Sequence, residues 1–269
     1  MNAPCFDTVI ISDLHLGSEV SRAEAALRML KETSFRRLIL LGDIFCDLNF
    51  RRLTKEHWKF LSYIRKLSNP KRNIEVVWVE GNHDHGLSEV MSHLVGVQVY
   101  QEYQWVFNGM RHLAIHGHQF DRMIFHNLFF SNLLTGYFLL LQKMDFGKKR
   151  FVRLLDRLNT SWLRLSSKVQ AGAFSQAHLR GAQRVFCGHT HQALSAFKDG
   201  IEYFNTGSWT QARATYVTVD EEGATIHEYI ERVDNRDTRE ERGDIDPALA
   251  DVIDSAGLPA YASYEGVLS

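Results

Sequence analysis

Five segments of the chain combine an apolar run with aspartate, asparagine or histidine at its end, and in four of them a glycine stands beside the polar residue. Glycine permits a positive φ and a close backbone approach where a chain turns sharply. The repetition predicts strands that end in polar loops, and a fold that brings the loops together. The segments are Ile10-Ile11-Ser12-Asp13-Leu14-His15, Leu40-Leu41-Gly42-Asp43, Val79-Glu80-Gly81-Asn82-His83-Asp84, Ile115-His116-Gly117-His118 and Phe186-Cys187-Gly188-His189-Thr190-His191.

The first loop shows how such a pattern can bind a metal ion. An apolar strand expected from Thr8 to Ile11 leads to Asp13 and His15, and side chains two residues apart on an extended segment point to the same side. A single Asp-x-His pair is more often a surface pair than a ligand pair. Five such loops are difficult to explain by core histidines and capping aspartates, so the set favours a metal site.

The first eighty or so residues alternate between strand and helix patterns. Ser21 is expected to cap the first helix, and Thr54 the second, which ends before Asn69-Pro70. This alternation predicts a parallel sheet with crossover helices, whose ligands bind outside the carboxyl ends of the strands. The expected strands are 8–11, 37–41 and 75–79, and the first helix is 21–31.

The rest of the chain is predicted to be mainly strands, interrupted by a helical segment at about 119–183. Asn108-Gly109 is a strong hairpin signal, and Asp199-Gly200 and Glu222-Gly223 are plausible turns. We expect one domain over 1–230 containing this insertion, followed by a polar tail over 231–269. The expected strands are 97–100, 104–107, 111–115, 184–187, 194–198, 202–205, 215–219 and 224–229.

Bulk composition excludes some classes of protein. The net charge is −1 with histidine neutral, so no overall field attracts nucleic acid or membranes. The three cysteines are far apart and odd in number, which argues against a disulfide framework and for a reducing compartment. Met1 to Asp7 shows no secretory signal pattern. The expected location is therefore the cytoplasm.

The ordered series of loops resembles the calcineurin-like metallophosphoesterase superfamily. The resemblance implies an α/β fold, a four-layer α/β/β/α sandwich with two metal ions between the sheets. Carried over by motif, it implies one metal held by Asp13, His15 and His191 and a second held by Asn82, His116 and His189, with Asp43 bridging both. It also implies that His83 is a catalytic histidine that binds no metal and is oriented by Asp84.

This ligand set suits divalent ions such as Mn²⁺, our first choice, or Fe and Zn²⁺. Two such ions about 3.5–4 Å apart can clamp a phosphoryl group and lower the pKa of a bridging water. The resulting hydroxide attacks phosphorus in line, and His83 assists the leaving oxygen by protonation or charge stabilisation. The expected partner is an anionic phosphate ester or diphosphate.

The insertion has an unusual composition. Residues 123–142 contain no Asp, Glu, Lys or Arg, and the following stretch is basic, with Arg150, Arg153 and Arg157 as candidate substrate-binding residues beside His118. One interpretation is a helix buried against the main domain. The other is a lid for an acylated anionic substrate, with peripheral contact at the inner membrane surface. A single membrane span is excluded, because His116 and His189 are expected to bind the same ion.

The insertion and the run from Gly117 to Asp121 resemble the bacterial UDP-2,3-diacylglucosamine diphosphatase group. This resemblance implies cleavage of the diphosphate of a lipid-linked or nucleotide substrate in lipid A biosynthesis. The chain departs from the best-known branch of the group, which has Arg in place of His83 and Asp in place of His118.

Three alternatives to a lipid-linked substrate are open. The first is a soluble phosphodiesterase or phosphomonoesterase that acts on nucleotides or phosphoproteins. A nuclease is disfavoured, since no groove of aromatic and basic residues is recognisable. A binding module without catalysis would lack ligands, and here none is missing.

The roles of several other residues near the loops are open. Asp47 is either a residue that orients a ligand or merely polar, and Cys46 is expected to pack. The turn from Asn205 to Trp209 follows the last ligand loop and is a candidate for contact with substrate or with a ligand.

Overall fold

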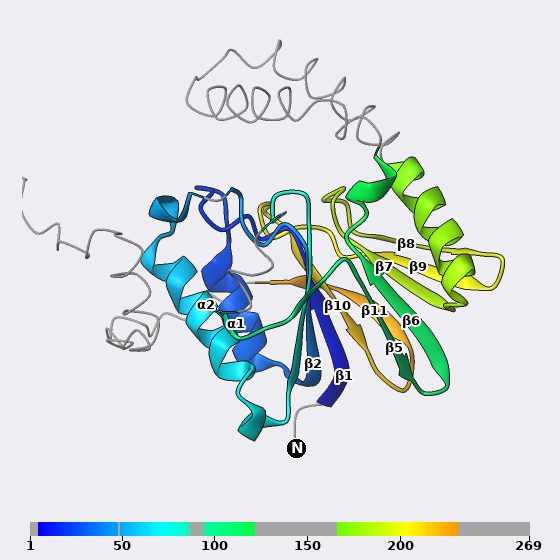
Figure 1. Ribbon diagram of the computed structural model, residues 1–269, viewed down its shortest axis with the longest axis horizontal. Coiled ribbons are helices and arrows are strands. Elements are labelled where there is room, and N and C mark those ends of the chain that lie inside the picture. Colours follow the sequence, from blue (N-terminus) through cyan, green and yellow to red (C-terminus); the bar gives the residue numbers. More distant parts are fainter. Residues whose placement is uncertain are drawn as a thin grey trace, which may run out of the picture.

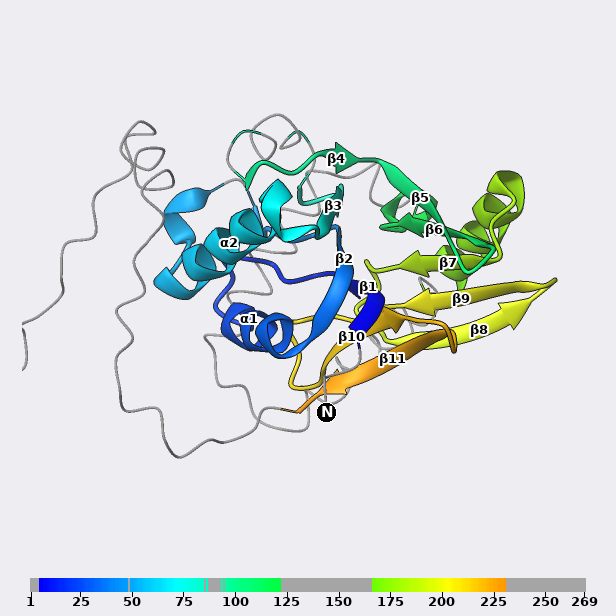
Figure 2. The same ribbon diagram turned by 90° about the horizontal axis from the view of Figure 1, so that it is seen from below.

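The computed structural model describes residues 5–47, 49–84, 86, 93, 95–121 and 166–230. Two β-sheets face each other, and helices cover the outer face of each sheet (Figures 1 and 2). Helices α1 (Ala23–Glu32) and α2 (Lys55–Leu67) lie on one side. Residues 166–180 are helical and lie on the other side. This arrangement confirms the expected four-layer α/β/β/α sandwich.

The first sheet has the strand order β11-β10-β1-β2-β3-β4. Strands β1 to β4 pair in parallel, as the alternation of strands and helices predicts, whereas β10 and β11 are antiparallel additions at the other edge. The bounds are β1 Cys5–Ile11, β2 Ser34–Leu41, β3 Glu75–Val79, β4 Val99–Tyr100, β10 Ala214–Val219 and β11 Ala224–Tyr229.

The second sheet has the order β5-β6-β7-β9-β8, with β6, β7 and β9 parallel in its centre. Antiparallel hairpins form both edges, β5 with β6 and β8 with β9. The two turns expected in this sheet are confirmed. Asn108 and Gly109 have φ values of 49° and 74°, and Asp199 and Gly200 have φ values of 51° and 79°. Positive φ at both central residues is what a type I′ turn requires. The bounds are β5 Glu102–Phe107, β6 Met110–Ile115, β7 Arg184–Cys187, β8 Leu194–Lys198 and β9 Ile201–Asn205.

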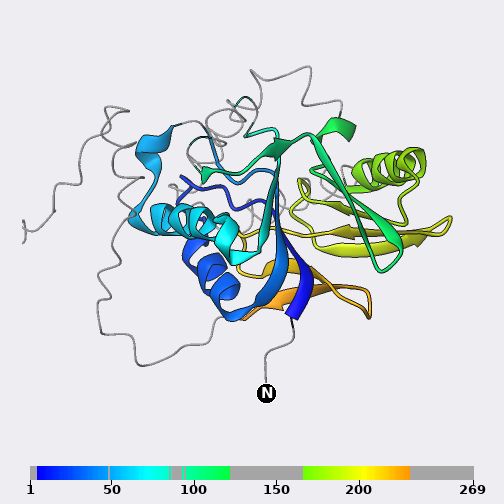
Figure 3. The same cartoon turned by 60° about the horizontal axis from the view of Figure 1, so that its bottom comes forward.

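Three apolar clusters hold the four layers together. One joins α1 and α2 to the first sheet, for example through Leu30 and Leu61. The second lies between the sheets and includes Ile39 and Phe186. The third packs the helix over 166–180 on the second sheet. Figure 3 shows the two sheets between their helical layers.

The start of the first helix differs from the prediction. Ser21 does not cap it, since α1 begins at Ala23 and the Ser21 hydroxyl donates to the carbonyl of Leu14 at 2.7 Å. Thr54 does precede α2, and its backbone N–H donates to His57 Nδ1 at 3.1 Å. The first contact ties the residues before α1 to the loop after β1, and the second ties Thr54 to the first turn of α2.

The predicted helical insertion at 119–183 lies between β6 and β7, and the structure describes only its two ends. Its last part, 166–180, forms the outer layer on the second sheet, and the added Cβ of an alanine at Gly172 would lie 2.3 Å from the ring of Phe120. The apolar and basic stretches of 122–165 lie outside the described residues, as does the tail at 231–269. Within the described ranges, no helix is long and apolar enough to cross a membrane.

His112 of β6 gives the fold an acid-sensitive position. It is fully buried, and its ring stacks on Trp105 with centroids 4.9 Å apart. Burial lowers the pKa of His112 from 6.5 to about 4, assisted by the charge of Arg184. The unfolded chain therefore binds more protons between these two pH values, and stability falls as the pH drops through this window.

We expect His112→Phe to unfold less readily in acid than the wild type. The substitution keeps the stacking and removes a destabilising contribution of up to about 1.4 kcal/mol per pH unit below pH 6.5. Urea unfolding between pH 4.5 and 7.5 measures the difference in stability between the two proteins. Parallel pH profiles for the two proteins would contradict the assignment.

Candidate metal centre

Five parallel strands deliver the five polar loops to one end of the sandwich. Strands β1, β2 and β3 come from the first sheet and β6 and β7 from the second. Parallel strands place their carboxyl ends on the same side, so the loops that follow them converge. The polar residues expected from the sequence thus meet where the two sheets adjoin.

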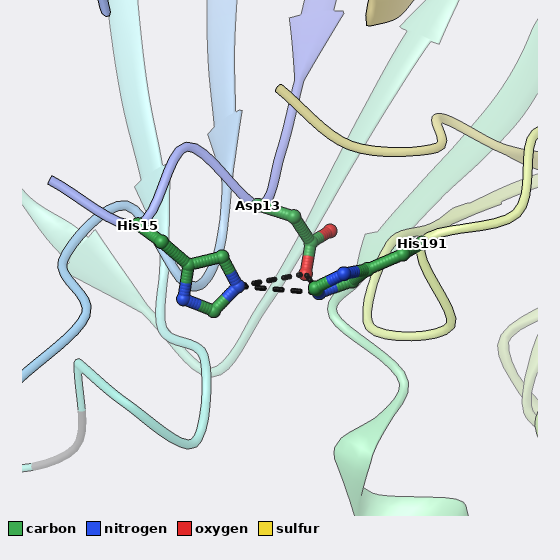
Figure 4. A group of neighbouring side chains, drawn as sticks. All are labelled: Asp13, His15 and His191. Carbon is green, nitrogen blue, oxygen red and sulfur yellow. Dashed lines mark hydrogen bonds and ion pairs between the residues drawn. The ribbon is translucent and has the colours of Figure 1, made fainter. Parts of the chain in front are cut away.

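Asp13, His15 and His191 form the first group (Figure 4). Their ligand atoms point toward one another, although two of the residues follow β1 and the third follows β7. Asp13 Oδ1 lies 3.1 Å from His191 Nε2 and 3.9 Å from His15 Nε2, and the two imidazole nitrogens are 3.2 Å apart. Three such atoms within this space can share one cation.

Asp43 connects this group with a second one. Its carboxylate lies 3.3 Å from His116 Nε2 and groups with His116 and His189. Asp43 also groups with His15 and His83, each set having all its ligand atoms within 4.8 Å of one another. A carboxylate shared in this way is placed to contact two neighbouring cations.

The donor atoms fit divalent cations. Buried polar atoms in proteins nearly always have hydrogen-bond partners, yet within the described ranges Asp13 Oδ1, Asn82 Oδ1, His116 Nε2 and His189 Nε2 make no hydrogen bond. His116 Nδ1 donates to the carbonyl of Leu41 at 2.9 Å. This bond keeps a proton on Nδ1, so Nε2 is the nitrogen that binds a metal once it has released its own proton, the usual arrangement for a metal-binding histidine.

The charges at the centre also favour cations. Burial would lower the pKa of His116, but the carboxylate of Asp43 overrides it and raises that pKa to about 9. For Asp43 itself, the penalty of burial is exceeded by His116 and His83, which hold its pKa well below the usual range. The buried Asp43 carboxylate therefore keeps its negative charge and attracts positive charge to the loops.

The ligand residues themselves adopt the left-handed backbone region. Asp13 and His15 have φ values of 52° and 48°, Asp43 has 50°, and His189 and His191 have 68° and 56°. The expectation that Asp13 and His15 meet because they lie on an extended segment is therefore wrong, since β1 ends at Ile11. Non-glycine residues in this region cost on the order of 1–3 kcal/mol each and cluster at functional sites.

Two of the glycines serve close approach rather than turn geometry. An added Cβ at Gly81 would lie 2.2 Å from the backbone nitrogen of Asp43, and one at Gly188 would lie 2.6 Å from Asp13 Oδ2. Any side chain at these positions would push the carboxylates away. The Gly-Asn and Gly-His pairs of the sequence are thus required by the packing of one loop on another.

His83 lies beside the centre, but Asp84 does not orient it as the sequence analysis expected. His83 Nδ1 donates to the carbonyl of Cys46 at 2.7 Å, and the His83 ring lies 5.1 Å from that of His15. Asp84 instead accepts backbone N–H groups from Ile44 at 3.1 Å and Phe45 at 2.9 Å. Asp84 therefore shapes the loop that carries Asp43 and the Cys46 carbonyl, and acts on His83 only through that loop.

Asp84→Asn should destabilise the metal-free protein by about 1–3 kcal/mol, because the amide offers one acceptor where two are needed and turns a donor toward an N–H group. Burial and the nearby Asp43 raise the pKa of Asp84 to about 7, so removing the carboxylate charge offsets part of this loss at neutral pH. Urea unfolding measures the change. Unaltered stability would show that the two N–H contacts are dispensable.

The remaining candidates lie in different places. His118 is buried, with its ring 5.5 Å from that of His116, so it adjoins the centre, and its role in substrate binding stays a prediction. Asp47 pairs with Arg52 at 2.6 Å and accepts the backbone N–H of Asn49 at 2.8 Å, and whether it also orients a ligand stays a prediction. Arg150, Arg153 and Arg157 lie outside the described residues.

Sequence reasoning missed contacts made by small residues. The carbonyl of Cys46 and the hydroxyls of Ser12 and Thr206 bind the candidate groups directly or through one further side chain. A carbonyl leaves no trace in a sequence. Thr206 lies in the turn from Asn205 to Trp209, for which the sequence indicates contact with substrate or with a ligand but not which residue makes it.

Comparison with known proteins finds relatives that match most of this chain. Two curated proteins named UDP-2,3-diacylglucosamine hydrolase, from Neisseria meningitidis serogroups B and C, are each 26% identical over 242 residues, covering 80% of this chain and 95% of theirs. Among solved structures, the phosphoesterase Yfce from E. coli aligns with a TM-score of 0.45 and 18% identity, covering 80% of this chain and 88% of its own.

The family model for calcineurin-like phosphoesterases matches residues 6–193. This range contains all five polar loops and well over half of the chain. The centre described above, with its histidine and carboxylate groups, is what a metal-dependent phosphoesterase needs. The chain belongs to the calcineurin-like phosphoesterase family and is a metal-dependent phosphoesterase.

Proposed function

We propose that the protein hydrolyses the diphosphate of a lipid-linked nucleotide substrate with two divalent ions, Mn²⁺ being the first choice. The observation that carries the two-ion part is the position of Asp43, which shares one cluster with His116 and His189 and another with His15. One carboxylate between two sets of imidazoles suits a pair of ions. Asp13, His15 and His191 would hold one, and Asn82, His116 and His189 the other.

Bound there, the ions supply Lewis acidity and a nucleophile at neutral pH. The protein's own groups supply orientation and proton transfer. The Cys46 carbonyl keeps a proton on His83 Nδ1 and leaves Nε2 as the nitrogen that changes protonation. A protonated Nε2 can donate to the leaving oxygen, so we assign His83 the role of assisting departure of the leaving group.

The substrate proposal is supported by the name of the curated relatives, which match 80% of this chain. An acylated sugar nucleotide would need apolar surface near the centre, and residues 123–142 have suitable composition. The acyl chains, in this proposal, contact that segment while the diphosphate lies at the ions. The basic residues that follow it would neutralise the phosphates.

The test compares three substrates with metal-reconstituted protein: UDP-diacylglucosamine, the same sugar nucleotide without acyl chains, and a simple aryl phosphodiester. We expect kcat/KM to be highest for the acylated compound in the presence of detergent. Equal rates on the acylated and bare sugar nucleotides would overturn the lipid part of the proposal. Activity on the aryl diester alone would favour the soluble phosphodiesterase instead.

A further inference from the structure

We infer that Thr206 is a positioning residue that, through Ser12, holds the carboxylate of Asp13 so that only its Oδ1 atom faces a metal ion. The inference rests on the proposed role of Asp13 as a ligand and adds a residue that follows β9, a strand that leads to none of the five loops. It concerns how the two sheets are held in register at the centre.

The two oxygens of Asp13 have different surroundings. Oδ2 accepts the hydroxyl of Ser12 and the backbone N–H of His189, the latter at 3.1 Å. Oδ1 makes no hydrogen bond within the described ranges and faces His191 Nε2 at 3.1 Å. With Oδ2 occupied by two donors, the carboxylate can present only Oδ1 to a cation.

Counting protons gives the direction of the hydroxyl chain. Ser12 has one hydroxyl proton, which it donates to Asp13 Oδ2, so its oxygen is free to accept. Thr206 Oγ1 lies 2.6 Å from Ser12 Oγ and 3.2 Å from the carbonyl of Cys187. The shorter contact makes Thr206 the donor to Ser12, and the chain runs from Thr206 to Ser12 to Asp13.

This chain crosses from one sheet to the other. Ser12 follows β1 of the first sheet, whereas Thr206 follows β9 of the second. Asp13 and His191, which must contact the same ion, are divided in the same way between β1 and β7. Both hydroxyl residues are buried, so they are shielded from bulk solvent. A link between the sheets at this point sets the distance between the two ligands.

Other groups in and around the turn hold Thr206 in place independently of its hydroxyl, and its backbone N–H donates to the carbonyl of Cys187 at 2.9 Å. The Asn205 side chain donates to the carbonyl of Gly188 at 2.7 Å, and the carbonyl of Thr206 accepts from Thr215 at 2.7 Å. The Ser208 hydroxyl donates to the carbonyl of Asp13 at 3.2 Å. Removing only the Thr206 hydroxyl should therefore loosen the carboxylate without unfolding the turn.

The experiment uses Thr206→Val, which keeps shape and removes the hydroxyl, and Thr206→Ser, which restores it. Thr190→Val is the matched control, since Thr190 is equally buried between two ligand histidines but its hydroxyl makes no hydrogen bond within the described ranges. Mn²⁺ binding to metal-stripped full-length protein is measured by calorimetry and elemental analysis. Unfolding of each metal-free variant is recorded alongside.

We expect Thr206→Val to weaken one of two Mn²⁺ sites about 10–100-fold, the usual cost of removing a group that orients a ligand. Thr206→Ser and Thr190→Val should bind both ions as the wild type does. Unchanged affinity in Thr206→Val, no rescue by serine, or an equal loss in Thr190→Val would overturn the inference. If Thr206→Val does not fold, Ser12→Ala removes the donor to Oδ2 and is judged by the same criteria.

A wild type that binds fewer than two ions would refute the two-metal proposal instead. The two failures are therefore distinguishable, because one concerns the wild type and the other the difference between variants.

Discussion

Asp43→Asn should lose activity by about 10²–10⁴-fold together with its metal ions, because removing one member of a buried ionic cluster costs roughly 3–5 kcal/mol. Asparagine has the size of aspartate and can keep the contact from the His83 backbone N–H, which Asp43 Oδ1 accepts at 2.9 Å. What it removes is the charge shared between the two groups of imidazoles. Elemental analysis after gel filtration and kcat/KM on an aryl phosphodiester measure both losses.

The matched control for this change is Asp47→Asn, four residues further along the same loop. Asp47 pairs with Arg52 and belongs to neither ligand group. It should keep both ions and nearly full activity. Full metal content in Asp43→Asn, with activity at the wild-type level, would remove Asp43 from the position between two ions and with it the two-ion proposal.

His83→Ala should lower kcat by about 10²–10⁴-fold, the usual contribution of a general acid, while both metal ions stay bound. His83 groups with His15 and Asp43 in space, so geometry alone allows it to be a ligand or a proton donor. Metal content separates the two roles. Loss of an ion in step with activity would make His83 a ligand and refute its assignment as the acid.

The dependence on the leaving group gives a second reading of the same variant. A leaving oxygen of low pKa needs little protonation, so the defect of His83→Ala should shrink on an activated aryl ester compared with an alkyl ester. A constant defect across the two esters would contradict proton donation. His178→Ala, at an exposed position on the helix over 166–180, serves as the control.

Local patterns predicted most of the strands, because strand ends here are marked by an abrupt change from apolar to polar residues. The bounds expected for β3 and β7 agree with the structure, and the three Gly-containing turns join antiparallel strands where expected. The predicted start of α1 at Ser21 is wrong, because the helix begins at Ala23 and the hydroxyl of Ser21 donates to the carbonyl of Leu14. A serine before an apolar run caps the helix only where its hydroxyl oxygen can accept an N–H group of the first turn.

The role of the helix at the end of the predicted insertion could not be read from the sequence either. Helical periodicity continues through 166–180, but periodicity cannot tell a lid from a layer of the sandwich. Only the packing of Val169 and Ala173 on Leu113 and Val185 assigns this helix to the second sheet. The apolar face of a helix indicates that the face is covered, but it does not identify the element that covers it.

The sequence by itself determined which side chains are candidates for the metal centre, because such a centre needs carboxylates, an amide and imidazoles, and these stand at the ends of apolar strands. Only the tertiary structure decided how these side chains are oriented. The left-handed backbone at Asp13 and Asp43, the attachment of Asp84 to the loop rather than to His83, and the hydroxyl link from Thr206 all join residues far apart in the chain. Such contacts depend on the register of one sheet against the other, which no local pattern encodes.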